Sequence, residues 1–136
     1  MRIVAHTVIA TASIVSLLGA ARAADMTGAE IKAFLSNKTA YLETTAASAG
    51  GMAGQVVIYW SEDGTALYKT PSGSIMHGKW QIKDNTNCTD WKERPGTGCV
   101  RYDKNGDVVT VIDVKSGQTR AKIVKTAAGN VEKLAP

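Results

Sequence analysis

Histidine and cysteine, which supply most metal ligands and many catalytic nucleophiles, are scarce in this sequence, with two of each among 136 residues. No histidine cluster and no glycine-rich cofactor motif compensates for them. Zinc sites usually need four such ligands, and nucleophilic catalysis needs a nucleophile beside a base. The scarcity therefore favours a non-catalytic domain over an enzyme.

Blocks of like charge are missing as well. The 16 basic and 12 acidic side chains are interspersed along the chain and give a formal net charge of +4. Proteins that bind nucleic acid or anionic membranes usually gather their basic side chains in a patch or stripe. We therefore predict that no nucleic acid is a partner of this protein.

The first residues have the pattern of an export signal. Arg2 precedes an uncharged, mostly apolar run over residues 3–21, and Ala-Arg-Ala at residues 21–23 places small side chains at the −3 and −1 positions of a cleavage site. We predict a signal peptide over residues 1–23, cleaved after Ala23, with Ala24 as the alternative position. The alternative is an uncleaved anchor, because the uncharged run approaches the length that spans a bilayer.

Cleavage leaves residues 24–136, which is enough chain for a single β-domain with one modest core. Its location is then the periplasm or the cell exterior, with no stable membrane insertion after cleavage. Disulfides persist in such oxidising compartments. Cys88 and Cys99 are the only cysteines, so we expect them to be bonded to each other.

One short helix is expected after the signal. Thr27 and Glu30 have the spacing of a capping box, and Ile31, Phe34 and Leu35 form one apolar stripe. The pattern ends near residue 36. A helix of two turns is unstable alone, so it must lie against the sheet or plug one end of it.

The rest of the chain has the hydrophobic period of strands separated by turn residues. The predicted strands are residues 39–45, 55–60, 65–70, 74–83, 88–92, 99–103, 107–114 and 119–126. About eight strands without helical crossovers make an antiparallel meander, and a closed or nearly closed lipocalin-like barrel would remove most exposed edges. A two-sheet sandwich is the alternative. We expect side chains to fill the barrel centre and the chain from residue 127 to be loose.

One predicted strand has two distinct faces. Over residues 74–83, Met76, Gly78, Trp80 and Ile82 alternate with polar and charged side chains. Alternation of this kind places one set inside the barrel and the other in solvent. We therefore expect Trp80 to be part of the core.

Short motifs surround the cysteines: Gly78-x-Trp80, Cys88-x-x-Trp91, Cys99-x-x-Tyr102 and Gly106-Asp107. Together they resemble the pattern of a family of small exported proteobacterial proteins of unknown function. The resemblance covers about residues 33–115. It implies a secreted antiparallel β-domain with a disulfide, and it implies no catalytic residue.

We expect binding contacts to come from loops, because the strands of a small barrel commit their inner face to packing. The longest candidates are residues 46–54 and residues 93–98, and the second lies between the cysteines. Trp91 and Arg94 are residue types enriched at binding hot spots, and a tethered loop loses less entropy when it binds a partner. The alternative is that the disulfide only stabilises the fold. We predict a binding or interaction domain whose partner is a small ligand or an envelope protein, with no cofactor and no metal.

A small enzyme acting on an envelope or sugar substrate is the alternative function. Paired carboxylates can hydrolyse glycosidic bonds, and the acids near the disulfide are Asp84, Asp90, Glu93 and Asp103. Aromatic side chains could line a ligand site, although many of them must be core. The aromatic set is Tyr59, Trp60, Tyr68, Trp80, Trp91 and Tyr102.

Overall fold

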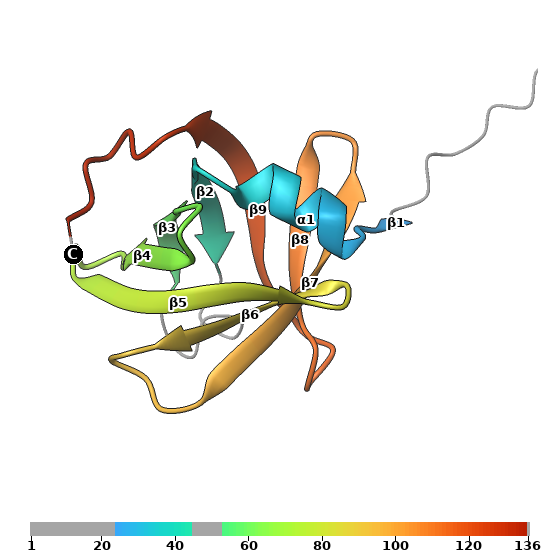
Figure 1. Ribbon diagram of the computed structural model, residues 1–136. Coiled ribbons are helices and arrows are strands. Elements are labelled where there is room, and N and C mark those ends of the chain that lie inside the picture. Colours follow the sequence, from blue (N-terminus) through green and yellow to red (C-terminus); the bar gives the residue numbers. More distant parts are fainter. Residues whose placement is uncertain (1–23, 45–52, 136) are drawn as a thin grey trace, which may run out of the picture.

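A computed structural model describes residues 24–44 and 53–135 of the chain (Figure 1). The predicted signal peptide and most of the loop expected at residues 46–54 lie outside these ranges. The described elements are β1 (Ala24–Asp25), α1 (Gly28–Leu35), β2 (Lys38–Thr44), β3 (Gly54–Trp60), β4 (Thr65–Lys69), β5 (Ile75–Lys83), β6 (Thr86–Trp91), β7 (Thr97–Asn105), β8 (Val108–Asp113) and β9 (Thr119–Ala128). Within these ranges, no helix has the length and apolar character needed to cross a bilayer.

Strands β2 to β9 form a closed, eight-stranded antiparallel barrel. Each strand pairs with the next in sequence, and β9 also pairs with β2, so the meander closes on itself. The predicted fold class is therefore confirmed, as a barrel and not a sandwich. The short strand β1 was not predicted; it pairs with Asp103 and Lys104 of β7, beyond the point where the β6 ladder ends.

The helix α1 lies against one end of the barrel (Figure 1). Its capping box is present: the Thr27 hydroxyl accepts from the Glu30 N–H at 3.3 Å, and the Glu30 carboxylate accepts from the Thr27 N–H at 2.7 Å. Ile31 and Leu35 have no exposed surface and belong to the barrel core. This helix therefore closes one end of the barrel, as its apolar stripe predicted.

A glycine is required where α1 begins. A Cβ at Gly28 would lie 2.2 Å from the Asp84 carbonyl oxygen, in the turn between β5 and β6. The Gly28 N–H donates to the Asn85 side-chain oxygen at 2.9 Å in the same turn. The backbone of α1 and this turn can approach each other only because no side chain separates them.

The strand β5 has the two faces that its alternation predicted. Met76, Gly78 and Trp80 are buried, while Lys79 and Gln81 are exposed. The Trp80 indole N–H donates to the Ser61 carbonyl at 2.8 Å, so its polar atom is satisfied inside the core.

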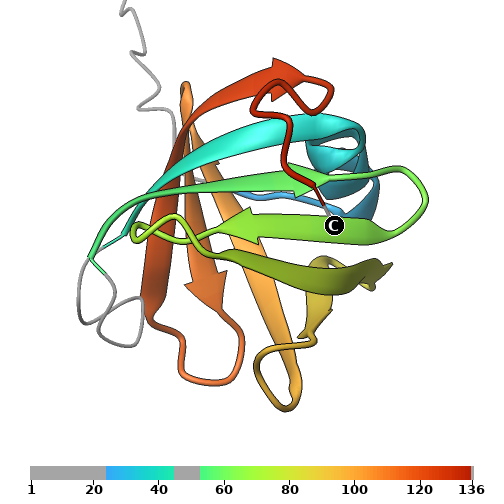
Figure 2. The same cartoon turned by 90° about the vertical axis from the view of Figure 1, so that its left-hand side faces the viewer.

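The prediction of a loose C-terminus is wrong. Leu134 is only 6% exposed and packs with Val57 and Leu67 on the outer face of the barrel. The Asn130 side chain donates to the Leu134 carbonyl at 2.7 Å and accepts from the Leu134 N–H at 2.9 Å. A single buried leucine thus anchors the segment after β9, which crosses the outside of the barrel (Figure 2).

Candidate ligand-binding pocket

The centre of the barrel is not filled, contrary to prediction. A cavity of about 480 Å³ extends from the interior toward the end of the barrel away from α1. Its walls come from inward-facing residues of the strands, including small ones such as Thr89, Gly98 and Ala121, which leave space unoccupied. The volume falls within the range of about 300–1,000 Å³ typical of small-molecule sites.

Two loops of the described chain border the mouth of this pocket. Residues 92–96 join β6 to β7, and residues 114–118 join β8 to β9. Figure 2 shows both loops at the lower edge of the barrel, away from α1. Arg94, Pro95 and Gly96 of the first loop and Lys115 of the second contribute to the pocket wall.

Aromatic rings form much of the inner wall. The ring of Trp91 lies 6.3 Å from Trp60 in a tilted arrangement and 5.5 Å from Tyr68 in an edge-on arrangement. All three side chains line the cavity, together with Tyr102. Edge-on and tilted rings at these separations attract one another, so the wall is held in place by its own contacts.

Gly78 makes room for this aromatic wall. It pairs directly with Trp91 across the β5–β6 ladder, and a Cβ at position 78 would lie 2.7 Å from Cε3 of that indole. The ring of Trp91 therefore occupies the space that any larger residue at position 78 would fill.

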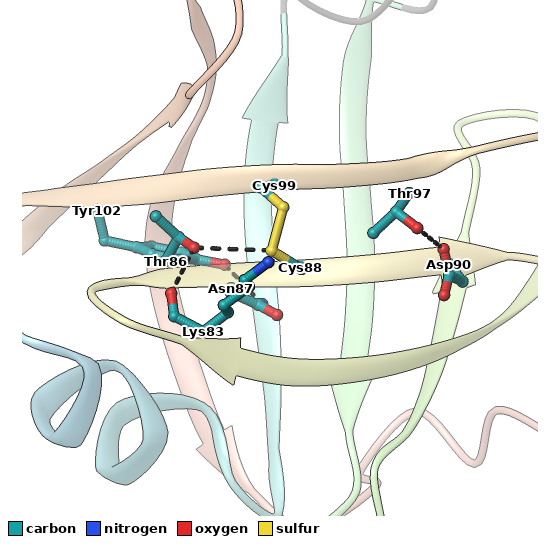
Figure 3. Close-up of a disulfide and its surroundings, with 8 residues drawn as sticks. All are labelled: Lys83, Thr86, Asn87, Cys88, Asp90, Thr97, Cys99 and Tyr102. Carbon is teal, nitrogen blue, oxygen red and sulfur yellow. Dashed lines mark hydrogen bonds between the residues drawn. A yellow bond between two sulfur atoms is a disulfide. The ribbon is translucent and has the colours of Figure 1, made fainter.

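The few polar groups of the interior are uncharged. Asn87 has no exposed surface and donates through Nδ2 to the Tyr102 hydroxyl at 3.1 Å (Figure 3). Burial raises the pKa of Tyr102 far above its ordinary value, so its hydroxyl stays neutral at physiological pH. Among the described residues, Asn87 Oδ1 and Trp60 Nε1 have no hydrogen-bond partner. A ligand or a water molecule in the barrel could satisfy such groups.

Charged side chains are confined to the mouth of the pocket. Three basic residues, Arg94, Lys115 and Arg120, line the cavity beside one acid, Asp113. The Asp113 carboxylate accepts from the Ser116 hydroxyl at 2.7 Å, from the Ser116 N–H at 2.8 Å and from Arg120 Nη2 at 2.8 Å. These bonds, the Ser116 hydroxyl first, lower the pKa of Asp113, so it is ionised at neutral pH.

Side-chain contacts anchor the loop of residues 92–96 at both of its ends. The Glu93 carboxylate accepts from the His77 N–H at 2.9 Å and lies 2.8 Å from His77 Nδ1. At the start of β7, the Thr97 hydroxyl donates to Asp90 (Figure 3). The hydrogen bonds from His77 lower the pKa of Glu93. The loop that carries Arg94 is therefore attached to β5 and to β6.

The predicted disulfide joins Cys88 and Cys99 directly across the β6–β7 ladder, with a Cα–Cα distance of 4.0 Å (Figure 3). The neighbours Asn87 and Val100 pack toward the interior, so by strand alternation the cysteines face the outer side. The disulfide thus links β6 to β7 next to the loop of residues 92–96, and it lies on the outer side of the barrel, away from the pocket.

The two candidate binding residues come together at the pocket. Trp91 lies in its inner wall and Arg94 at its mouth.

The six aromatic residues considered for a ligand site lie in different places. Trp60, Tyr68 and Tyr102 line the cavity, as Trp91 does, whereas Trp80 belongs to the core and Tyr59 packs on the outer face with Leu134. Sequence reasoning missed Asp113, Lys115 and Arg120, because it gave no sign that the β8–β9 loop and the cysteine loop border one cavity.

The acidic residues considered for an enzyme do not converge. Asp84, Asp90, Glu93 and Asp103 are all missing from the pocket wall. Asp103 instead lies 3.5 Å from Arg101 on the outer side of β7, and Glu93 pairs with His77. Across residues 24–44 and 53–135, no group of three or more His, Cys, Asp or Glu side chains is placed to hold a metal ion.

Comparison with protein-family models, with curated proteins and with solved structures finds no match for this chain. The resemblance to small exported proteins of unknown function therefore stays a prediction from the motifs.

Proposed function

We propose that this protein is an exported, non-catalytic binding protein that holds a small, largely apolar molecule in the barrel. The pocket of about 480 Å³, walled by aromatic and aliphatic side chains and bordered by two loops, carries this proposal. Small-molecule sites are typically concave, mostly apolar and equipped with a few polar groups. The pocket is concave, with an inner wall of aromatic and aliphatic side chains and with polar groups that include the Tyr102 hydroxyl.

Export is supported by the signal pattern of residues 1–23 and by the disulfide, since disulfides persist in the periplasm and outside the cell. The resemblance to small exported proteobacterial proteins agrees with the same location. The proposal includes no cofactor and no metal.

A small ligand is favoured over the other partners considered. Trp91 and Arg94 contribute to the wall of a cavity, where a small molecule can contact both, and a docked envelope protein would reach that cavity only through its mouth. For the enzyme alternative, only one acidic side chain lines the described pocket, and it is already bound by Ser116 and Arg120.

The test is titration of the folded, exported protein with Nile red, a neutral dye whose emission depends on the polarity of its surroundings. We expect saturable binding of one dye per protein, with blue-shifted emission and quenching of tryptophan fluorescence from Trp60 and Trp91. Absence of saturable binding would overturn the proposal.

A pair of variants separates pocket binding from surface binding. A Cβ at Gly98 would meet no atom within 4 Å, and position 98 lies in the pocket wall, so Gly98→Leu places a side chain in the cavity without a clash at Cβ. Gln81→Leu adds a similar side chain to the exposed face of β5. The first variant should weaken dye binding and the second should not. Equal affinities would place the dye elsewhere and overturn the proposal.

A further inference from the structure

Building on the proposed function, we infer that the ligand of this pocket is an organic acid, bound with its apolar body inside the barrel and its anionic group between the basic residues of the mouth. Among the residues that the structure describes, three cationic side chains and one acid line the cavity. All four lie at the mouth, and the interior wall is uncharged.

Basic side chains outnumber acidic ones in the described wall of the pocket. Lys115 and Arg120 lie in that wall together with Arg94, and Asp113 is its one described acid. A positive mouth attracts anions during encounter and orients them as they enter.

The position of Arg120 suits it to bind a second acceptor. Its guanidinium remains half-exposed, and its bond to Asp113 uses the terminal nitrogen Nη2. A guanidinium has five N–H donors in a rigid plane, so one such bond leaves donors for the carboxylate of a ligand. Asp113 is itself fixed by two bonds from Ser116, and it therefore acts as a positioning residue for Arg120.

The interior determines the orientation of the ligand. Moving a carboxylate into an apolar cavity without a partner is strongly unfavourable, and the deep wall offers only neutral polar groups such as Tyr102 and Thr89. The rings of Trp60, Tyr68 and Trp91 favour an apolar or aromatic body instead. The acid group consequently stays at the mouth while the body enters.

The experiment compares two probes that differ only in the head group, decanoic acid and 1-decanol, as competitors of bound Nile red at pH 7 and low salt. We expect the acid to bind roughly three- to tenfold more tightly, as expected for one or two partly exposed ion pairs, and to lose this advantage at high salt. Equal affinities would overturn this inference and leave the proposed function standing. Failure of both probes and of the dye would instead remove the proposed function.

Charge variants then locate the effect. Lys115→Gln should weaken binding of decanoic acid several-fold and leave the affinity for 1-decanol unchanged. Addition of Arg120→Gln should weaken binding of decanoic acid further. Lys92→Gln is the matched control, since Lys92 is an exposed cation beside the same mouth but outside the pocket wall. If Lys92→Gln weakens binding of decanoic acid as much as Lys115→Gln does, the overall charge of the protein and not the mouth explains the preference for the acid over the alcohol. The inference then fails.

Discussion

At the scale of single residues, the space in the pocket depends on which positions of its wall have no side chain. Gly78 and Gly98 both face the interior, one under the ring of Trp91 and one beside open space. The same chemical change at these two glycines should therefore have different effects. A core position that is already occupied resists added volume, whereas an open one accepts it.

Gly78→Ala should lower the free energy of unfolding by about 1–3 kcal/mol, because its Cβ would lie 2.7 Å from the Trp91 ring and force that ring to move. Gly98→Ala is the control and should change stability by less than about 0.5 kcal/mol. Urea unfolding followed by tryptophan fluorescence measures both. Equal stabilities of the two variants would contradict the proposed packing of Trp91 on Gly78.

The Asp113 carboxylate should make stability depend on pH in the acid range. Hydrogen bonds from Ser116 and Arg120 hold its pKa in the folded state below the ordinary value. Stability from such a group is fully present above the unfolded pKa of about 3.9 and is lost as the pH falls through the lower folded value. The Tm of the wild type should therefore decline below about pH 4 more steeply than that of Asp113→Asn. Parallel declines would show that Asp113 contributes nothing to this dependence.

At the scale of elements, the β6–β7 hairpin carries the disulfide, the loop of Arg94 and part of the aromatic wall. The Cys88–Cys99 bond closes a segment with a sequence separation of 11. Glu93 and His77 attach the same loop to β5. Covalent and polar links of this kind restrict the loop, and a restricted loop loses less entropy when a ligand binds at the mouth.

Reduction of this disulfide should lower the free energy of unfolding by about 2–3 kcal/mol, as the chain-entropy model gives for a short loop. The Cys88→Ser/Cys99→Ser variant should match the reduced protein. Intact mass after alkylation checks the bond: native exported protein should gain mass only after reductant. Two alkylatable thiols without reductant would contradict the disulfide in the exported protein.

At the scale of the whole molecule, the barrel closes through contacts between distant parts of the chain. Strand β9 pairs with β2 along its length, although most of the chain separates them. Near the other end of the described chain, Asp25 of β1 forms an ion pair with Arg101 of β7.

Export should yield a mature chain that begins at Ala24. The reason is the small-residue pattern at residues 21–23, which signal peptidase recognises. Mass spectrometry of protein from the envelope fraction measures the N-terminus, and Ala23→Arg is the control that should retain the precursor. Recovery of full-length wild-type chain in the membrane fraction would instead support the uncleaved anchor.

Much of the fold could be predicted because local patterns suffice for it. The capping box of Thr27 and Glu30, the alternation along β5 and the turn residues between strands each depend on nearest neighbours in the chain. The anchored C-terminus could not be predicted in this way. Leu134 packs on Val57 and Leu67, and a contact between segments so far apart leaves no periodic signal near residue 134.

The candidate site was predictable in part. Trp91 and Arg94 were found from residue type and from their place beside the cysteines, and both line the pocket. Lys115 and Arg120 could not be distinguished from other surface cations, because sequence does not reveal which loops border one mouth.

The sequence by itself determined the antiparallel meander, the short helix and the pairing of the only two cysteines, since each follows from local periodicity, capping or composition. Only the tertiary structure decided whether the barrel is filled or hollow. That outcome depends on the summed volume of side chains from many strands, and on contacts across strands such as that of Gly78 with the ring of Trp91. The volume of a cavity in a closed barrel depends on side chains from all of the strands, so it cannot be predicted from any one segment of the sequence.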